Sequence, residues 1–486
     1  MASTLAYYIS KAQKNFTISN NLGQTICTHN LTEILDFFLA VEPQAHRFVW
    51  NLYQVIGLLQ DLLPKSSYNE LIEKDRTWYE DYKLFSSAGR IFSITHKKHL
   101  HDNFYEPQEI NLFHLCQYFP EDNVHDANDV YNKAVELIST LKEMGLEPNK
   151  FSSAVAMYDE CILSKCDLPN IYNLPDNNAL EASEYAHHIG WRELRACYKI
   201  GHWAKTWDAD ISGAYPSIMS NLPDTRNMKC WYVKNYQKCD FGIFKGKINI
   251  TSEYSPIVDE DGIPFKGIKD NFYLTTEQWG FINHFKLGCF EPYDGWLINF
   301  TSLDKPFHEL MNDLYDARGE SGLWKRIPKS ISVGIGGRLA QEYPERYGEL
   351  FNPILQVMTT SRVSLNTMRI VLENNLQDNL ISLIVDGCLF DTNPNINTGT
   401  KLGEWKVSEP TPALVLSLAF QWLLDKKPAN QTYRSMKQAI SSNPNKSFYN
   451  GIFFYKDLAT NRQFDKFPKT GRDLLNNIYQ SRAIEA

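Results

Sequence analysis

Two aspartates stand where the sequence predicts the ends of strands, a position from which carboxylates can bind metal ions. Asp210 lies in the strand-like run 207–211, five positions before Tyr215, and Pro216 then suits the first turn of a helix. A carboxylate at such a strand end can bind a divalent cation, while backbone amides at the helix start can bind phosphate. An aspartate before a turn can equally serve as a helix cap, so this motif does not decide the function by itself.

The second aspartate, Asp386, stands at the centre of the apolar run 379–392. The dipeptide Asp386-Gly387 is typical of a tight hairpin, so we predict two strands with Asp386 at their tip. A carboxylate in apolar surroundings is costly to desolvate unless it has a partner, and a divalent cation would supply one. The alternative is an ordinary exposed Asp-Gly turn.

A positively charged stretch followed by glycines forms the third motif. Arg318 and Lys329 are eleven positions apart, about three helical turns, so both side chains could project to one side of a helical hairpin that also carries Lys325. Arginine binds phosphate as a two-pronged donor and lysine as a point charge. The glycines within 333–338 would let a base pair lie flat against the backbone. A solvated basic helix is the alternative.

Hydrophobic periodicity predicts the elements that must position these residues. Strands are predicted at 5–10, 15–20, 24–29, 47–50, 82–87, 90–96 and 241–250. Helices are predicted at 31–40, 51–63, 129–146, 275–285 and 351–375, and a helix pair at 306–337. Strands that alternate with helices favour an α/β (α+β) fold class built in layers.

Length and composition limit the class of protein. The 486 residues suffice for three or four domains, and 43% hydrophobic with 13% aromatic residues can form a large core, which argues against overall disorder. No apolar run approaches the ~18 residues of a membrane span, and the N-terminus lacks the features of a secretion signal. Nine scattered cysteines, of which Cys161 and Cys166 are the closest pair, argue against a disulfide framework and a structural zinc site. A reducing cytoplasm is expected, that of a host cell if the protein is viral.

The charge is unevenly distributed along the chain. The net charge is −8, which disfavours a nucleic-acid partner, but the segment 426–486 contains 11 Lys and Arg against four Asp and Glu. This segment is therefore +7, and the preceding residues carry −15. A basic segment next to an acidic remainder is compatible with one module that binds nucleic-acid phosphates and a second that binds metal ions. Charge alone equally fits a solvated polar face.

Taken in chain order, the Asp210 motif, the positively charged stretch and the Asp386 hairpin resemble motifs A, B and C of the family B DNA polymerases in their compact phage and mobile-element form. Two further segments add to the resemblance. Residues 185–193 are similar to the Tyr-x-Gly-Gly linker between the exonuclease and polymerase parts, and residues 402–406 to the palm strand that leads to the thumb. The resemblance covers roughly 180–415, and the N-terminal domain more faintly.

The resemblance implies a right-hand polymerase with palm, fingers and thumb and an N-terminal RNase H-like domain of the exonuclease type. The implied parts are an exonuclease-like domain at 1–145, a connector at 146–200, a palm at 201–301 and 346–415, fingers at 302–345, and a basic thumb at 416–486. A positively charged thumb suits contact with duplex phosphates, which needs no base recognition.

The resemblance also assigns roles to single residues. Asp210 and Asp386 would be catalytic and, with the Ile211 carbonyl, would ligate two Mg²⁺ ions, or Mn²⁺ as a substitute. The residues implied in dNTP binding are Ile211, Ser212, Gly213, Ala214, Tyr215, Arg318, Lys325 and Lys329. Tyr215 would be the steric gate, whose ring leaves no room for a 2′-hydroxyl. The implied reaction adds dNTPs to a primer 3′ end on template DNA, and a clamp, a primase or another replication protein would be further partners.

Several positions depart from the family pattern. Ile384 stands where motif C has its first aspartate, and Val333 and Gly336 stand where motif B has asparagine and tyrosine. The first change weakens the metal site without removing the more essential acid. The other two remove contacts to the nascent base pair, so we expect lower base selectivity.

The N-terminal domain lacks the acids of the exonuclease pattern. Its first strand should carry Asp-x-Glu, yet 7–10 contains no carboxylate, and no acid occurs at 54–56. Asp129 would be the one acid that remains of the third exonuclease motif. A nuclease that depends on two cations cannot hold them without its first-strand acids, so we predict a scaffold domain without 3′–5′ proofreading that could still bind single-stranded template.

Two other functions are compatible with the sequence. One is a decayed polymerase that serves as a nucleic-acid-binding accessory protein, and the other is an unusual nucleotidyltransferase that is RNA-templated or primer-independent. The joint presence of Asp210, Tyr215, Lys329 and Asp386 favours catalysis, because a binding protein has no need for two separated acids.

Overall fold

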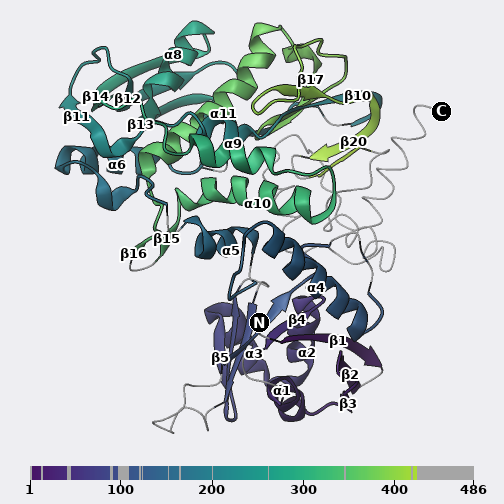
Figure 1. The fold of residues 1–486 in the computed structure, drawn as a ribbon. Coiled ribbons are helices and arrows are strands. Elements are labelled where there is room, and N and C mark those ends of the chain that lie inside the picture. Colours follow the sequence, from purple (N-terminus) through teal and green to yellow (C-terminus); the bar gives the residue numbers. More distant parts are fainter. Residues whose placement is uncertain are drawn as a thin grey trace. The chain divides into compact units, whose positions relative to one another are not determined.

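The computed structural model describes residues 3–423 with short gaps (Figure 1). The gaps are 13–14, 41–44, 88–90, 97–108, 120–121, 123, 152, 164–165, 200, 261, 344–345 and 418–419. The chain divides into two compact units: unit 1 comprises Met1–Asp167 and Asp316–Gly334, and unit 2 comprises Leu168–Tyr315 and Ile335–Ala486. Most of the expected basic thumb, residues 424–486, lies outside the described residues.

Unit 1 contains, in its described part, a mixed eight-stranded sheet in the order β3-β2-β1-β4-β8-β7-β6-β5. The strands are β1 (Thr4–Ala12), β2 (Asn15–Asn20), β3 (Thr25–Thr28), β4 (His46–Val49), β5 (Arg76–Tyr79), β6 (Tyr82–Ser87), β7 (Ile91–His96) and β8 (Glu109–His114). Strand β4 is parallel to both β1 and β8, and the other pairs are antiparallel. Parallel neighbours need crossover connections, which the helices of this unit help to supply.

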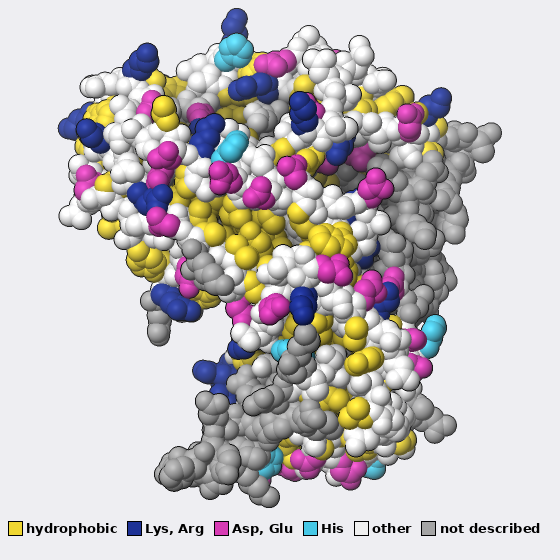
Figure 2. All heavy atoms as spheres, in the orientation of Figure 1, with side chains coloured by type: hydrophobic (Ala, Val, Ile, Leu, Met, Phe, Trp, Pro, Cys, Tyr) yellow, Lys and Arg dark blue, Asp and Glu magenta, His cyan; other side chains and the backbone are white. Residues whose placement is uncertain are grey.

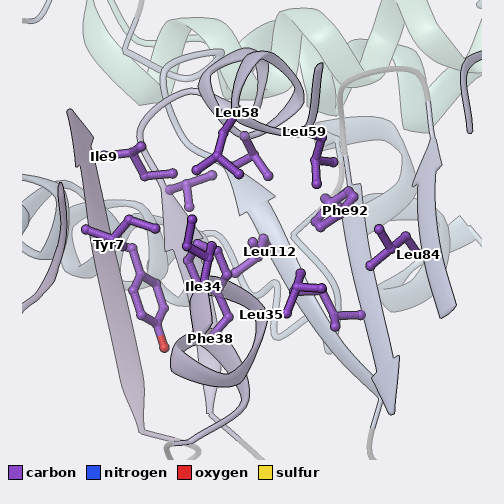
Figure 3. Close-up of a cluster of buried hydrophobic side chains, with 14 of the residues drawn as sticks. Tyr7, Ile9, Ile34, Leu35, Phe38, Leu58, Leu59, Leu84, Phe92 and Leu112 are labelled. Atoms are coloured by element: carbon purple, nitrogen blue, oxygen red, sulfur yellow. The ribbon is translucent and has the colours of Figure 1, made fainter. Parts of the chain in front are cut away.

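The helices of unit 1 are amphipathic. They are α1 (Leu31–Leu39), α2 (Leu52–Leu62), α3 (Lys65–Lys74), α4 (Ala127–Glu143) and α5 (Ala154–Cys161). Helix α4 shows the pattern clearly, because Val130, Ala134, Leu137 and Leu141 are fully buried along one face. Figure 3 shows the core, in which Tyr7 and Ile9 of β1 lie near Ile34 and Phe38 of α1, together with leucines of α2 and side chains from further strands.

Unit 2 contains two large antiparallel sheets in its described part, in the orders β21-β20-β10-β18-β17-β9 and β11-β14-β12-β13. The first has β9 (Arg195–Cys197), β10 (Gly201–Ile211), β17 (Leu380–Ile384), β18 (Gly387–Phe390), β20 (Thr411–Ser417) and β21 (Phe420–Leu423), and β19 (Trp405–Val407) pairs with β10. The second has β11 (Met228–Val233), β12 (Phe241–Ile250), β13 (Gly267–Thr275) and β14 (Gly288–Phe300). One core joins them, with Phe244, Leu297 and Phe390 all fully buried.

Helix α11 (Pro353–Glu373) is the longest described helix and is buried along most of its length. It contacts α6 (Asn177–Ile189), α7 (Ala214–Met219) and α8 (Thr276–His284). Buried hydroxyls of this helix, such as those of Thr359 and Ser364, donate a hydrogen bond to the carbonyl four residues earlier, which offsets the cost of burying them.

The remaining described elements are two helices, one hairpin and three 3₁₀ turns. They are α9 (His308–Asp316), α10 (Gly322–Arg338), the hairpin of β15 (Glu342–Tyr343) and β16 (Arg346–Tyr347), and the 3₁₀ turns Ile171–Asn173, Thr225–Asn227 and Gln377–Asn379. No helix among the described residues is long and apolar enough to cross a membrane. None of the nine cysteines forms a disulfide bond. On the face drawn in Figure 2, acidic and basic side chains are interspersed.

The segment expected to be a connector contains helices that the sequence analysis missed. Helix α6 begins after Asp176, whose side chain accepts a hydrogen bond from the Ala179 amide, and it ends at Gly190, whose φ is 70°. The buried face of α6 consists mostly of alanine, with Ala182 and Ala186 among its members. Alanines produce a weak hydrophobic pattern, which explains why periodicity did not reveal this helix.

Candidate functional site

A sharp strand-to-helix turn positions Asp210. The Cα of Asp210 pairs with Gly387 of β18 on one side and with Lys406 of β19 on the other, which fixes it within the sheet. Gly213 then adopts a left-handed φ of 63° and starts α7. A Cβ on Gly213 would lie 2.9 Å from the Leu402 side chain, so this turn needs glycine for its conformation and for its space.

The turn that carries Asp386 lies one residue earlier than the sequence predicts. Ile384 pairs with Gly387, so the two central residues of the hairpin are Val385 and Asp386 rather than Asp386 and Gly387. Val385 has a φ of 58°, a conformation that glycine or asparagine adopts more readily. A β-branched residue held there costs about 1–3 kcal/mol, and such strain persists only where the surroundings impose it.

Three hydrogen bonds impose this strained turn. The Val385 amide donates to the Leu194 carbonyl at 2.8 Å, and the Thr367 hydroxyl donates to the Val385 carbonyl at 3.1 Å. The Ile211 amide donates to the Asp386 carbonyl at 3.2 Å. The last bond joins the turn directly to the residue that follows Asp210, so Asp210 at the end of β10 and Asp386 in the β17–β18 turn are held beside each other in the chain fold.

Several carboxylates gather at this point of the sheet. A Cβ placed on Gly387 would be 3.5 Å from Oδ1 of Asp210, so this carboxylate reaches over the residue next to Asp386. Burial, and then the charges of Asp208, Asp386 and Asp210, raise the pKa of the Cys388 thiol. The sequence analysis passed over Asp208, although its spacing of two from Asp210 places both on one face of a strand.

The donor set suits a cation with a preference for oxygen. Asp210 and Asp386 supply two carboxylates, and Mg²⁺ typically binds one or two carboxylates with substrate oxygens completing its shell. Among the described residues, no group of three or more His, Cys, Asp or Glu side chains is arranged to hold a metal ion. A cation at the two aspartates would therefore depend on a bound substrate for further ligands.

The predicted phosphate-binding segment is only partly available for a ligand. The Ser212 amide donates to the Glu404 carbonyl at 2.8 Å, and the Ile211 amide is used by Asp386. The Ser212 side chain is 5% exposed and its hydroxyl has no hydrogen-bond partner in the described structure. The amides of Gly213 and Ala214 are therefore better placed than that of Ser212 to meet a phosphate.

Tyr215 is buried and held on two sides. Its hydroxyl donates to Oε1 of Glu193 at 2.7 Å, and its ring stacks on Trp191 with centroids 5.5 Å apart and an interplanar angle of 11°. Burial, and then the charge of Glu193, raise the pKa of the Tyr215 hydroxyl, which keeps the group protonated and able to donate. Glu193 in turn pairs with Arg195 at 2.7 Å.

Ile384 occupies the position at which the family pattern expects a further acid. It is 37% exposed, and its strand neighbour on β9 is Arg195. An exposed isoleucine beside a guanidinium group contributes nothing to a cation site. The carboxylates of this site come from β10 and from the turn between β17 and β18.

The predicted phosphate-binding cations belong to unit 1. Arg318 lies in the loop between α9 and α10 rather than on a helix, and its guanidinium donates to the Ser332 hydroxyl at 2.6 Å. The Ser332 hydroxyl donates to the Lys329 carbonyl at 3.0 Å, so Arg318 is held against the turn of α10 that carries Lys329. Lys325 and Lys329 are exposed and four positions apart, which places them on one face of α10.

A proline inside α10 helps to shape this loop. Pro328 has no amide hydrogen, so the carbonyl of Trp324 loses its usual helical partner. The Gly319 amide donates to that carbonyl at 3.2 Å instead. The bond draws the loop that contains Arg318 back onto the helix, which a sequence pattern could not have revealed.

Two clefts open beside α7 and α11 in unit 2. The smaller has a volume of about 290 Å³ and reaches Ile211 and Ala214, and the larger has a volume of about 610 Å³. Both include Arg369, which the sequence analysis did not select. In the larger cleft, Arg362 makes a two-pronged hydrogen-bonded pair with Glu277.

The expected exonuclease positions of unit 1 are filled by core side chains. Tyr7 packs edge-on against Phe38 in the middle of β1. Arg47 of the neighbouring strand is 1% exposed and donates to the carbonyls of Phe38 and Ala45. Burial raises the pKa of Tyr7, and the charge of Arg47 opposes this shift. A buried guanidinium beside β1 is unsuited to neighbouring metal cations.

Asp129 has a structural role in α4. Its side chain accepts a hydrogen bond from the His125 amide at 2.8 Å, and its own amide donates to Asp126 at 2.9 Å. Asp126 is the N-cap of the helix, and the Asp129 side chain fixes the residue that precedes this cap. The geometry explains the presence of this acid without a metal ion.

Comparisons with solved structures find a similar fold in Phi29 DNA polymerase. Its complex with primer-template DNA has a TM-score of 0.59 and 13% identity, over 88% of this chain and 89% of that chain. Its complexes with single-stranded DNA and with primer-template DNA plus incoming nucleotides have TM-scores of 0.58 and 0.57, each with 13% identity over 86% of this chain and 88% of that chain. No protein-family model and no curated protein matches the sequence. The likeness shows a shared fold, and it confirms the predicted mixed α/β class.

Proposed function

We propose that the protein is a DNA-directed DNA polymerase of the family B type, which extends a primer 3′ end with dNTPs. The observation that carries this proposal is the pairing of Asp210 with Gly387, which places Asp210 beside the turn that carries Asp386. The fold that contains this pair is similar to that of a DNA polymerase bound to primer-template DNA. Two acids from distant motifs, joined in such a fold, are the minimum that phosphoryl transfer with divalent cations requires.

Three groups of residues would bind the metal ions, bind the triphosphate and select the sugar. Asp210, Asp386 and the Ile211 carbonyl would hold Mg²⁺, or Mn²⁺ as a substitute; when bound, such ions neutralise phosphate charge and lower the pKa of the primer hydroxyl. The Gly213–Tyr215 backbone and the cations Arg318, Lys325 and Lys329 would bind the triphosphate. Tyr215 would lie against the sugar and exclude a 2′-hydroxyl.

The proposal assigns parts of the chain to the lobes of a right-hand polymerase. The palm would comprise 201–301 and 346–415, the fingers 302–345 and the thumb 416–486, after an exonuclease-like domain at 1–145 and a connector. Primer-template DNA and dNTPs would be the ligands, and a clamp or primase the protein partners.

Primer extension tests this proposal. The intact protein is incubated with a labelled primer on a DNA template, the four dNTPs and Mg²⁺, and we expect products longer than the primer. Parallel reactions replace the DNA template by RNA or omit the primer. Tight binding of primer-template without any extension would instead indicate a decayed polymerase with an accessory role, and extension confined to RNA template would indicate a different nucleotidyltransferase.

We predict that the protein has no 3′–5′ exonuclease activity. Tyr7 and Arg47 fill the region in which first-strand acids would be needed, and the Asp129 side chain fixes the residue that precedes a helix cap. The measurement is release of nucleotides from a 3′-labelled single strand in the presence of Mg²⁺, for the wild type and for Asp129→Ala. Both should release nothing above a protein-free reaction.

The control for this prediction is Asp126→Ala, which weakens the same helix start. Loss of either side chain should lower the free energy of unfolding by about 1 kcal/mol. Nucleotide release by the wild type that is lost in Asp129→Ala but kept in Asp126→Ala would show that unit 1 is an active nuclease.

A further inference from the structure

The segment that leads into β9 contacts both Tyr215 and the turn that carries Asp386. This segment, 191–195, follows the helix end at Gly190, and β9 begins at its last residue, Arg195. Trp191 and Glu193 contact Tyr215, and the Leu194 carbonyl accepts the Val385 amide in the turn that carries Asp386. Three residues of this short segment thus hold the ring proposed as the sugar gate and the turn of one proposed catalytic acid.

The space for Trp191 exists because residue 336 is a glycine. A Cβ on Gly336 would stand 3.3 Å from Cη2 of Trp191, 3.6 Å from Sδ of Met219 and 3.8 Å from Cδ1 of Tyr215. A contact of 3.3 Å is tighter than carbon atoms normally make, so any larger side chain at 336 would compete with the indole for its place. Trp191 therefore fills, from another segment, the volume that a side chain of α10 would otherwise occupy.

The contacts to Tyr215 restrain different motions of its side chain. The parallel indole of Trp191 limits tilting of the phenol ring, and the hydrogen bond to Glu193 fixes the position of the hydroxyl. The Arg195 guanidinium holds the Glu193 carboxylate in place at 2.7 Å. A side chain that excludes a single hydroxyl must be held to within a fraction of an ångström, which requires such support.

We infer that Trp191 and Glu193 are positioning residues that set the orientation of Tyr215 and thereby determine the discrimination against ribonucleotides. The inference rests on the proposed polymerase function and adds two residues to it. Neither residue touches the substrate in this assignment, and both act through the phenol ring.

The test compares deoxyribonucleotide and ribonucleotide insertion opposite one template base. The variants are Trp191→Ala and Glu193→Gln, and the quantity is the ratio of kcat/KM for the dNTP to kcat/KM for the matching rNTP. We expect each variant to lower this ratio by about tenfold, mainly through a lower KM for the rNTP, because a looser ring admits the 2′-hydroxyl. Trp191→Phe, which keeps an aromatic face, should retain most of the discrimination.

Two further variants separate positioning from a general structural role. Glu184→Gln, an exposed acid on α6, should leave the ratio unchanged. The double variant Trp191→Ala/Gly336→Tyr should recover part of the lost discrimination, since an aromatic ring from α10 can enter the vacated space. A variant that only lowers the stability of the fold would reduce insertion of the dNTP and of the rNTP equally, and the ratio of their kcat/KM values would not change.

The outcomes distinguish this inference from the proposed function. Absence of extension by the wild type with either sugar would overturn the proposed function, and this inference with it. Extension by the wild type together with an unchanged ratio in folded Trp191→Ala and Glu193→Gln variants would overturn the inference alone. Thermal unfolding of each variant establishes that it is folded.

Discussion

Replacing Asp210 or Asp386 by asparagine is expected to reduce the rate of primer extension about 10³-fold or more. Asparagine preserves the size of the side chain and removes its charge, so the loss reports the carboxylate itself. Asp210 is exposed and Asp386 half-buried; strand pairing holds the backbone of Asp210, and the bond from the Ile211 amide holds the carbonyl of Asp386. The free energy of unfolding should therefore change little. The measurement is single-turnover extension by one nucleotide.

The matched control for this pair is Asp378→Asn. Asp378 is an exposed acid in the 3₁₀ turn at the start of β17, the strand that ends beside Asp386. Its loss should leave extension within about twofold of the wild type. Retention of most activity in both Asp210→Asn and Asp386→Asn would refute the assignment of the catalytic site, whatever the control shows.

Lys329→Ala is expected to raise the KM for dNTPs by about 10–100-fold, with a smaller effect on kcat. Lys329 is exposed on α10, and among the described residues its ammonium group has no hydrogen-bond or ion-pair partner, so truncation of the side chain breaks no hydrogen bond or ion pair within the described structure. A hydrogen bond to a charged group contributes about 1.5–3 kcal/mol, which corresponds to this range. The steady-state dependence of insertion on dNTP concentration measures both constants.

Lys74→Ala provides the control, because Lys74 is an exposed helical lysine of the same unit that pairs with Glu70, one helical turn earlier. Its removal should leave the KM unchanged. Arg318 is a poorer probe than Lys329, since its contact with Ser332 mixes structural and binding effects. An unchanged KM in Lys329→Ala would mean that α10 does not bind the triphosphate.

The predicted strands and helices were most accurate where one face of an element is buried. The strands at 15–20 and 241–250 have the predicted bounds, and the helix predicted at 31–40 extends over Leu31–Leu39. In each, apolar residues recur with the period of the element, a signal carried by neighbouring residues alone. Where burial involves alanines, as in α6, the signal is too weak to find the helix.

The turn at Asp386 shows how tertiary contacts override a local preference. Asp-Gly favours a hairpin with both residues at its centre, yet the observed centre is Val385-Asp386. The bonds from Leu194 and Thr367 hold Val385 in a left-handed conformation that its own side chain disfavours. These partners are remote in the chain or on another element, so no local pattern could have indicated them.

Local patterns predicted a strand end at Asp210 and a tight turn at Asp386, and the order of the motifs along the chain, through the family resemblance, selected these acids together with Tyr215. Long-range packing alone decided that residues 176 positions apart become neighbours, and that Trp191 and Glu193 enclose Tyr215. The reason is that propensity acts over a few residues. Strand register and side-chain packing instead depend on which distant segment fills the adjacent space, and only the folded chain determines that choice.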